Sequence, residues 1–119
     1  MKILHTADWH LGTFRSPVKD GVNLRTEDTK RCLDELIRVA NEEKPDYSLV
    51  SGDIFHVGRL WSDRCCEEII TAIHYIRELA AVSKQVVVMR GTPNHDGSGQ
   101  FNVLSEMFAD VPNVHVVIT

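Results

Sequence analysis

Short apolar segments alternate with long amphipathic segments along the whole chain, and this alternation limits the folds that the chain can adopt. Four apolar segments predict strands: residues 1–7, 47–51, 85–90 and 114–118. Three segments with apolar residues at helical spacing predict helices between them: residues 26–43, 62–80 and 101–109. A strand–helix order repeated in this way predicts an α/β fold, in which parallel β-α-β-α-β-α-β elements form layers joined by right-handed crossovers.

Residues at the ends of the elements support these boundaries. Thr26 and Ser62 are predicted N-caps of the first two helices, and Pro45 is expected to end the first helix. The run Val86-Val87-Val88-Met89 contains no polar residue, which is typical of a parallel strand covered on both faces.

The composition is that of one soluble globular domain. The chain has 119 residues, of which 43% are hydrophobic and 25% charged. No apolar run approaches the roughly 20 residues of a membrane-spanning helix, and the start of the chain predicts no signal peptide. The cysteines Cys32, Cys65 and Cys66 lack Cys-x-x-Cys spacing, which argues against disulfides or a zinc knot and predicts a cytoplasmic protein. The net charge of −4 counts against nucleic-acid binding, unless bound divalent cations supply positive charge.

Polar residues follow each of the first three predicted strands. Asp8 and His10 come after the first strand, Asp53 after the second, and Asn94 and His95 after the third. The carboxyl ends of parallel strands lie along one edge of a sheet, where ligands bind. Residues two apart in an extended chain point to the same side, so Asp8 and His10 are expected to bind one cation together. The sequence therefore predicts a metal site at this edge.

The residue types favour a two-metal centre. The Asp53 carboxylate can bridge two cations, Asn94 offers a neutral oxygen and His10 a nitrogen, and such mixed ligands suit manganese, iron or zinc better than calcium. Two ions about 3.5–4 Å apart would hold a hydroxide and polarise a phosphate. His95 could stabilise the developing charge or protonate a leaving oxygen. Simpler interpretations stay open: an Asp after a strand often caps a turn, and His56 could neighbour the site or be a solvated loop histidine.

Three segments resemble the sequence motifs of the calcineurin-like metallophosphoesterases. They are Asp8-Trp9-His10-Leu11-Gly12, Gly52-Asp53-Ile54-Phe55-His56 and Gly91-Thr92-Pro93-Asn94-His95-Asp96. Within this superfamily, the opening of the chain is most similar to the nuclease subunit of the bacterial SbcCD DNA-repair exonuclease. The resemblance implies that Asp8 and His10 bind the first metal, that Asp53 bridges and Asn94 binds the second, and that His95 is the catalytic histidine. It also implies manganese as the ion, DNA as the substrate, an SbcC-like ATPase as the partner and a homodimer.

Two features differ from the motifs of that family. Thr92 and Pro93 separate Gly91 from Asn94, where the family usually reads Gly-Asn-His-Asp, so the loop is longer. No Gly-His-x-His segment follows His95 to supply further ligands. We therefore expect residues 1–119 to form the amino-terminal half of a metallophosphoesterase fold, incomplete at its carboxyl end, which alone binds metal weakly and hydrolyses little.

Two other functions fit the same residues. A phosphoesterase acting on small phosphoesters or nucleotides would use identical metal chemistry, and only a long substrate would need the basic residues Arg15 and Arg25 for binding. A non-catalytic α/β scaffold would expose the edge of its sheet to self-association. The favoured prediction is a metal-dependent phosphodiesterase that acts on DNA.

Overall fold

The structure of the protein, a computed structural model, describes the chain except for residues 13–17, 20–21, 57–62 and 119. The main sheet has four parallel strands in the order β1 (Ile3–Thr6), β4 (Tyr47–Ser51), β5 (Gln85–Met89) and β6 (Val114–Val117). The register places Leu4 beside Ser48, Ser48 beside Val86, and Val86 beside Val114. The predicted α/β fold with parallel strands is confirmed, and the carboxyl ends of all four strands lie at one edge.

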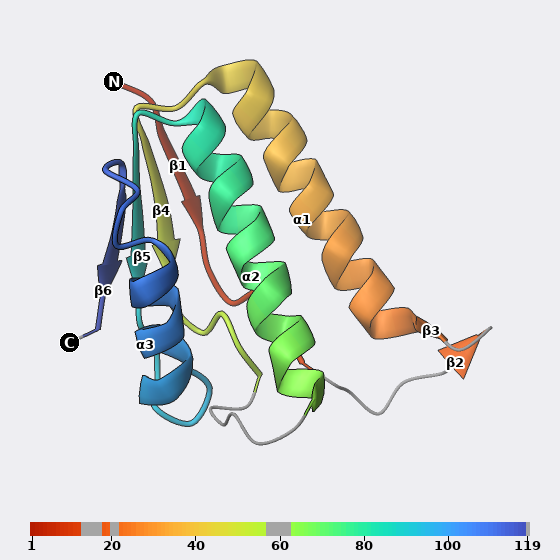
Figure 1. The fold of residues 1–119 in the computed structure, drawn as a ribbon. Coiled ribbons are helices and arrows are strands. Elements are labelled where there is room, and N and C mark those ends of the chain that lie inside the picture. Colours follow the sequence, from red (N-terminus) through yellow and green to blue (C-terminus); the bar gives the residue numbers. More distant parts are fainter. Residues whose placement is uncertain (13–17, 20–21, 57–62, 119) are drawn as a thin grey trace.

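Three helices lie on the same face of this sheet (Figure 1). They are α1 (Leu24–Glu43), α2 (Asp63–Val82) and α3 (Ser98–Met107). Helix α1 packs beside α2, α2 contacts β5 and α3, and α3 contacts β6. Each helix carries the chain back to the start of the next strand, as parallel pairing requires. None of the helices in the described part is both long and apolar enough to span a bilayer.

The start of α1 differs from the prediction. The helix begins at Leu24, so Thr26 lies inside its first turn and is not the N-cap. The preceding residues 13–25, in which the sequence predicts a polar loop, contain the antiparallel pair β2 (Val18–Lys19) and β3 (Val22–Asn23), and β3 leads directly into the helix. The end of α1 agrees with the prediction: the helix stops at Glu43, Lys44 adopts a left-handed φ of 47°, and Pro45 follows.

The hydrophobic core lies between the sheet and the helices. Val50, Val86 and Val88 face the helices and are completely buried. The buried aliphatic residues of α2 recur at helical spacing: Ile69, Ala72, Ile73, Ile76 and Leu79. Burying one large aliphatic side chain contributes about 1.5–3 kcal/mol to stability. The helical spacing of apolar residues also includes Ile70 and Met107 as inward positions, but Ile70 is 65% exposed and Met107 is 40% exposed.

The opposite face of the sheet carries no helix within the described residues. Four large apolar side chains on this side, Ile3, Tyr47, Met89 and Val117, are exposed. The expectation that β5 is covered on both faces is therefore wrong for the part of the chain that the structure describes. Its side chains alternate between the covered and the uncovered face, and the continuous apolar run hides that alternation.

Candidate metal centre

The loops that follow β1 and β4 run side by side. The backbone N–H of Asp8 donates to the carbonyl oxygen of Gly52 at 3.1 Å, and the N–H of His10 donates to that of Asp53 at 3.0 Å. These bonds continue the parallel pairing of the two strands beyond the ends of the sheet. Because the loops are joined, Asp8 and His10 lie directly beside Asp53, more than forty positions away in the sequence.

Trp9 anchors the first of these loops in the core. Its side chain is 5% exposed, its Nε1–H donates to Thr6 Oγ1 at 2.8 Å, and its ring meets the ring of Tyr75 edge to face at 6.5 Å. Asp8 and His10, on either side of Trp9, are not buried. The sequence thus alternates between an inward residue that holds the loop and outward residues that are available to a ligand.

Three predicted metal ligands have left-handed backbone conformations. The φ angles are 56° at Asp8, 48° at His10 and 50° at Asp53, and Lys44 is the one other non-glycine residue with positive φ in the described part of the chain. Such a conformation costs a non-glycine residue about 1–3 kcal/mol and is concentrated at functional sites. The expectation that Asp8 and His10 align in an extended strand is wrong, because β1 ends at Thr6 and both residues lie in the loop.

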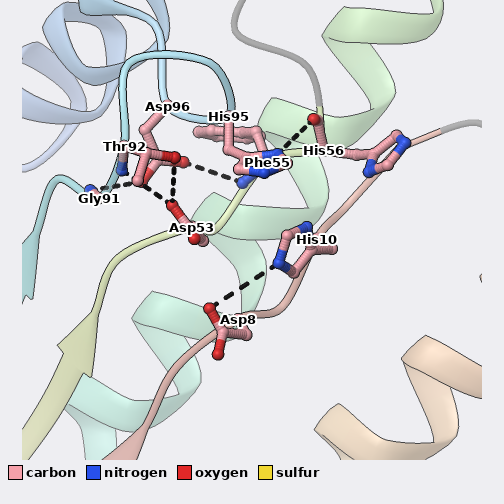
Figure 2. A network of polar contacts seen from close by, with 9 residues as sticks. All are labelled: Asp8, His10, Asp53, Phe55, His56, Gly91, Thr92, His95 and Asp96. Atoms are coloured by element: carbon pink, nitrogen blue, oxygen red, sulfur yellow. Dashed lines mark hydrogen bonds and ion pairs between the residues drawn. The ribbon is translucent and has the colours of Figure 1, made fainter.

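Asp8, His10 and Asp53 nevertheless come together. Each offers one ligand atom, and these atoms lie within 4.8 Å of one another. Nε2 of His10 is 3.8 Å from Oδ1 of Asp8 (Figure 2). Two carboxylates and one imidazole form a mixed oxygen and nitrogen donor set, which suits manganese, iron or zinc. The three side chains therefore fit a divalent cation.

Thr92 holds the carboxylate of Asp53 in place. Oδ1 of Asp53 accepts hydrogen bonds from the backbone N–H of Thr92 at 2.9 Å and from its hydroxyl at 3.1 Å. The backbone bond of Thr92 is the main cause that lowers the pKa of Asp53, with smaller contributions from its hydroxyl and from His95 and His10. Thr92, one of the two residues that make this loop longer than the family motif, thus favours the ionised form of Asp53 and orients its carboxylate.

Two glycines allow the loops after β4 and β5 to approach. A Cβ atom at Gly91 would lie 2.3 Å from both the backbone nitrogen and Oδ1 of Asp53. A Cβ atom at Gly52, where φ is +90°, would lie 2.6 Å from the Cα atom of Gly91. Both positions therefore need glycine, and the first of them borders the predicted bridging ligand directly.

Asp96 ties the same two loops together from inside. It is completely buried, Oδ1 accepts from the N–H of Phe55 at 3.0 Å, and Oδ2 accepts from the N–H of Gly91 at 2.7 Å. The backbone carbonyl of Asp96 also accepts from Nε of Arg90 at 2.8 Å. Asp96 belongs to one of the three sequence motifs, but the sequence alone predicted no role for it. An acidic residue directly after His95 is the one signal that could have indicated it.

His95 and His56 lie next to His10. Nδ1 of His95 donates to the backbone carbonyl of His56 at 2.7 Å, and the ring centroids of His95 and His10 are 4.6 Å apart. The His56 ring centroid is 6.0 Å from each of the other two. Burial is the main cause that lowers the pKa of His56, and the positive charges of His10, His95 and Arg25 add to the effect. Of the two interpretations of His56, the structure supports a neighbour of the site.

Three predicted site residues remain, Asn94, Arg25 and Arg15. Asn94 is exposed on the loop between Thr92 and His95, and its role as a ligand stays a prediction. Arg25 lies in the first turn of α1, where it lines a pocket of about 940 Å³ together with Asp8. Arg15 lies outside the described residues.

Comparisons with known proteins agree with this geometry. The family model for calcineurin-like phosphoesterases matches residues 1–118. The SbcD subunit of the nuclease SbcCD from Staphylococcus epidermidis is 30% identical over 108 residues, and that from Staphylococcus saprophyticus is 31% identical over 108 residues. Each match covers 91% of this chain and 26% of the relative, so the chain spans about a quarter of the length of these proteins. The chain belongs to the calcineurin-like phosphoesterase family.

Proposed function

We propose that this chain is the metal-binding, amino-terminal part of a phosphodiesterase that hydrolyses DNA together with an SbcC-like ATPase. The observation that carries the proposal is the meeting of Asp8, His10 and Asp53 at the carboxyl edge of a parallel sheet, with His95 beside them. The relatives are named as subunits of the nuclease SbcCD, which supports DNA as the substrate and SbcC as the partner.

Each residue has a defined task in this proposal. Asp8 and His10 would hold a first cation, Asn94 would hold a second, and Asp53 would serve both. When bound, two divalent cations, which we propose to be manganese, would lower the pKa of a water molecule and polarise the phosphate. Thr92 fixes the Asp53 carboxylate through two donors on Oδ1, so the carboxylate is oriented before a cation binds.

His95 is the proposed general acid. Its Nδ1–H is held by the backbone carbonyl of His56, so the ring orientation is fixed and Nε2 is the atom that can carry a proton to the leaving oxygen. Protein groups that are already oriented lower the barrier because they need no reorganisation during the reaction.

DNA contacts are proposed for the basic residues near the rim. Arg25 lies close enough to the site for its charge to affect His56, and Arg15 belongs to the same segment of the sequence. Guanidinium groups bind phosphates through paired hydrogen bonds. Neutralising phosphates releases counterions, so affinity for DNA should fall steeply with added salt.

The donor set within this chain is small for two cations. The first ion would have three protein ligands, Asp8, His10 and Asp53, whereas the second would have Asp53 and Asn94. We therefore propose that further ligands come from sequence beyond these 119 residues, and that the chain alone binds manganese weakly.

Calorimetric titration with manganese, paired with a nuclease assay on labelled DNA, tests these proposals. We expect weak binding, little hydrolysis, and loss of both in Asp53→Asn, whereas the control Glu106→Gln on the exposed side of α3 behaves like the unchanged chain. Unchanged manganese binding in Asp53→Asn would contradict the proposed site. Hydrolysis of a small phosphodiester without hydrolysis of DNA, or DNA binding that does not depend on salt, would instead favour a small-molecule phosphoesterase.

A further inference from the structure

We propose that His10, His56 and His95 form a second cation site, which prefers zinc to manganese and competes with the carboxylate site for His10. Each imidazole offers one nitrogen, and the three nitrogens lie within 4.8 Å of one another. All three residues are partly buried, which shields a bound ion from water. They come from three different loops, after β1, β4 and β5 (Figure 2).

The backbone fixes two of these histidines before any ion binds. The N–H of His56 donates to the carbonyl of Leu11 at 2.8 Å. Gly12 leaves room for His56, because a Cβ atom at Gly12 would lie 2.6 Å from the Cβ atom of His56. Nδ1 of His95 donates to the His56 carbonyl, which leaves the lone pair on Nε2. A histidine whose other nitrogen donates to a backbone carbonyl is the usual arrangement of a metal-binding imidazole.

The donor chemistry separates this set from the carboxylate set. Three neutral nitrogens without a carboxylate suit zinc or copper, whereas manganese prefers oxygen-rich ligands. Tetrahedral zinc with Zn–N distances of about 2.0–2.1 Å needs nitrogens roughly 3.4 Å apart. The nitrogens, which now lie within 4.8 Å, must therefore approach by about 1.5 Å at most. Side-chain rotations of this size are common when a ligand binds.

The two sets share His10, so they exclude each other. A neutral imidazole has one nitrogen with a free lone pair and can bind one cation at a time. Zinc on the three histidines would therefore take His10 from Asp8 and Asp53. It would also occupy His95, so zinc inhibits hydrolysis, and this last consequence alone rests on the proposed function.

The test uses two single substitutions and two metals, each added alone to the 119-residue chain. In His56→Gln, we expect zinc affinity measured by calorimetry to fall at least tenfold while manganese affinity changes less than twofold. In Asp8→Asn, we expect manganese affinity to fall at least tenfold while zinc affinity changes less than twofold. Thermal unfolding followed by circular dichroism checks that both variants are folded.

Two spectroscopic measurements complete the test. Zinc X-ray absorption should show three imidazole ligands in the unchanged chain. Added zinc should displace bound manganese, which restores the electron paramagnetic resonance signal of free manganese. The proposal is wrong if His56→Gln binds zinc as tightly as the unchanged chain, or if zinc and manganese bind together. None of these measurements requires hydrolysis. A negative result for the zinc site therefore does not contradict the nuclease proposal, which is tested separately by the nuclease assay.

Discussion

Replacing Asp96 should test how the two ligand-bearing loops are held. In Asp96→Ala, the N–H groups of Phe55 and Gly91 lose their acceptors, and the Phe55 N–H lies in a buried environment. A hydrogen bond to a charged group contributes about 1.5–3 kcal/mol. Two such bonds give an expected loss of about 3–6 kcal/mol, a large part of the 5–15 kcal/mol that stabilises a domain of this size.

Urea unfolding measures this loss, and a graded series makes the result specific. Asp96→Asn keeps one carbonyl oxygen as an acceptor, so it should lose about half as much free energy of unfolding as Asp96→Ala. The exposed residue Asp110 provides the control, and Asp110→Ala should change stability by less than about 0.5 kcal/mol. A loss below about 1 kcal/mol in Asp96→Ala, well under the range for charged hydrogen bonds, would refute the idea that this carboxylate joins the loops.

Three further predictions concern residues near the site and on α2. In Thr92→Val, one of the two donors to Asp53 is lost, so the pKa of Asp53 should rise toward its ordinary value in a carboxyl NMR titration. Because the pKa of Asp53 is lowered in the folded chain, its ionised carboxylate stabilises the fold at pH values above its ordinary pKa, and Thr92→Val should lose part of that stability. Equal acid unfolding curves for the variant and the unchanged chain would show that the Thr92 hydroxyl does not lower this pKa. Gly91→Ala should lower the melting temperature and weaken manganese binding, because its Cβ would overlap Asp53 at 2.3 Å, and an unchanged melting curve would show that the loops can separate at no cost. Burial raises the pKa of Glu68 to about 7, so the folded chain keeps a proton that the unfolded chain releases, and stability should fall as pH rises from about 4.5 to 7. Glu68→Gln should reduce that fall, as urea unfolding at pH 5 and pH 8 would show.

The fold could be predicted from the sequence because burial leaves a periodic pattern. The four strands and three helices appear where the apolar periodicity places them. The pattern does not show which apolar residues of a helix are covered by another element: Ile70 fits the apolar stripe of α2 but is 65% exposed. The short pair β2 and β3 has too few residues to produce a pattern of its own.

Three of the predicted site residues lie together in the structure, but not in the geometry that the sequence suggested. Strand ends indicated Asp8, His10 and Asp53, and the structure brings them together. The reason differs from the expected one, because hydrogen bonds between two loops, and not an extended strand, fix their positions. Thr92 was treated as a departure from the motif, although its two donors orient Asp53. Such contacts join residues about forty positions apart, and a single sequence carries no local sign of them.

The left-handed backbone at Asp8, His10 and Asp53 has a consequence for how this sequence can change. Glycine adopts that conformation without steric strain, so replacing each of the three residues by glycine would relieve backbone strain. The residues that would bind a cation therefore make the fold less stable than it could be. A selection for thermal resistance alone would be expected to erase these side chains first, and stabilised variants recovered in that way would have lost their affinity for metal.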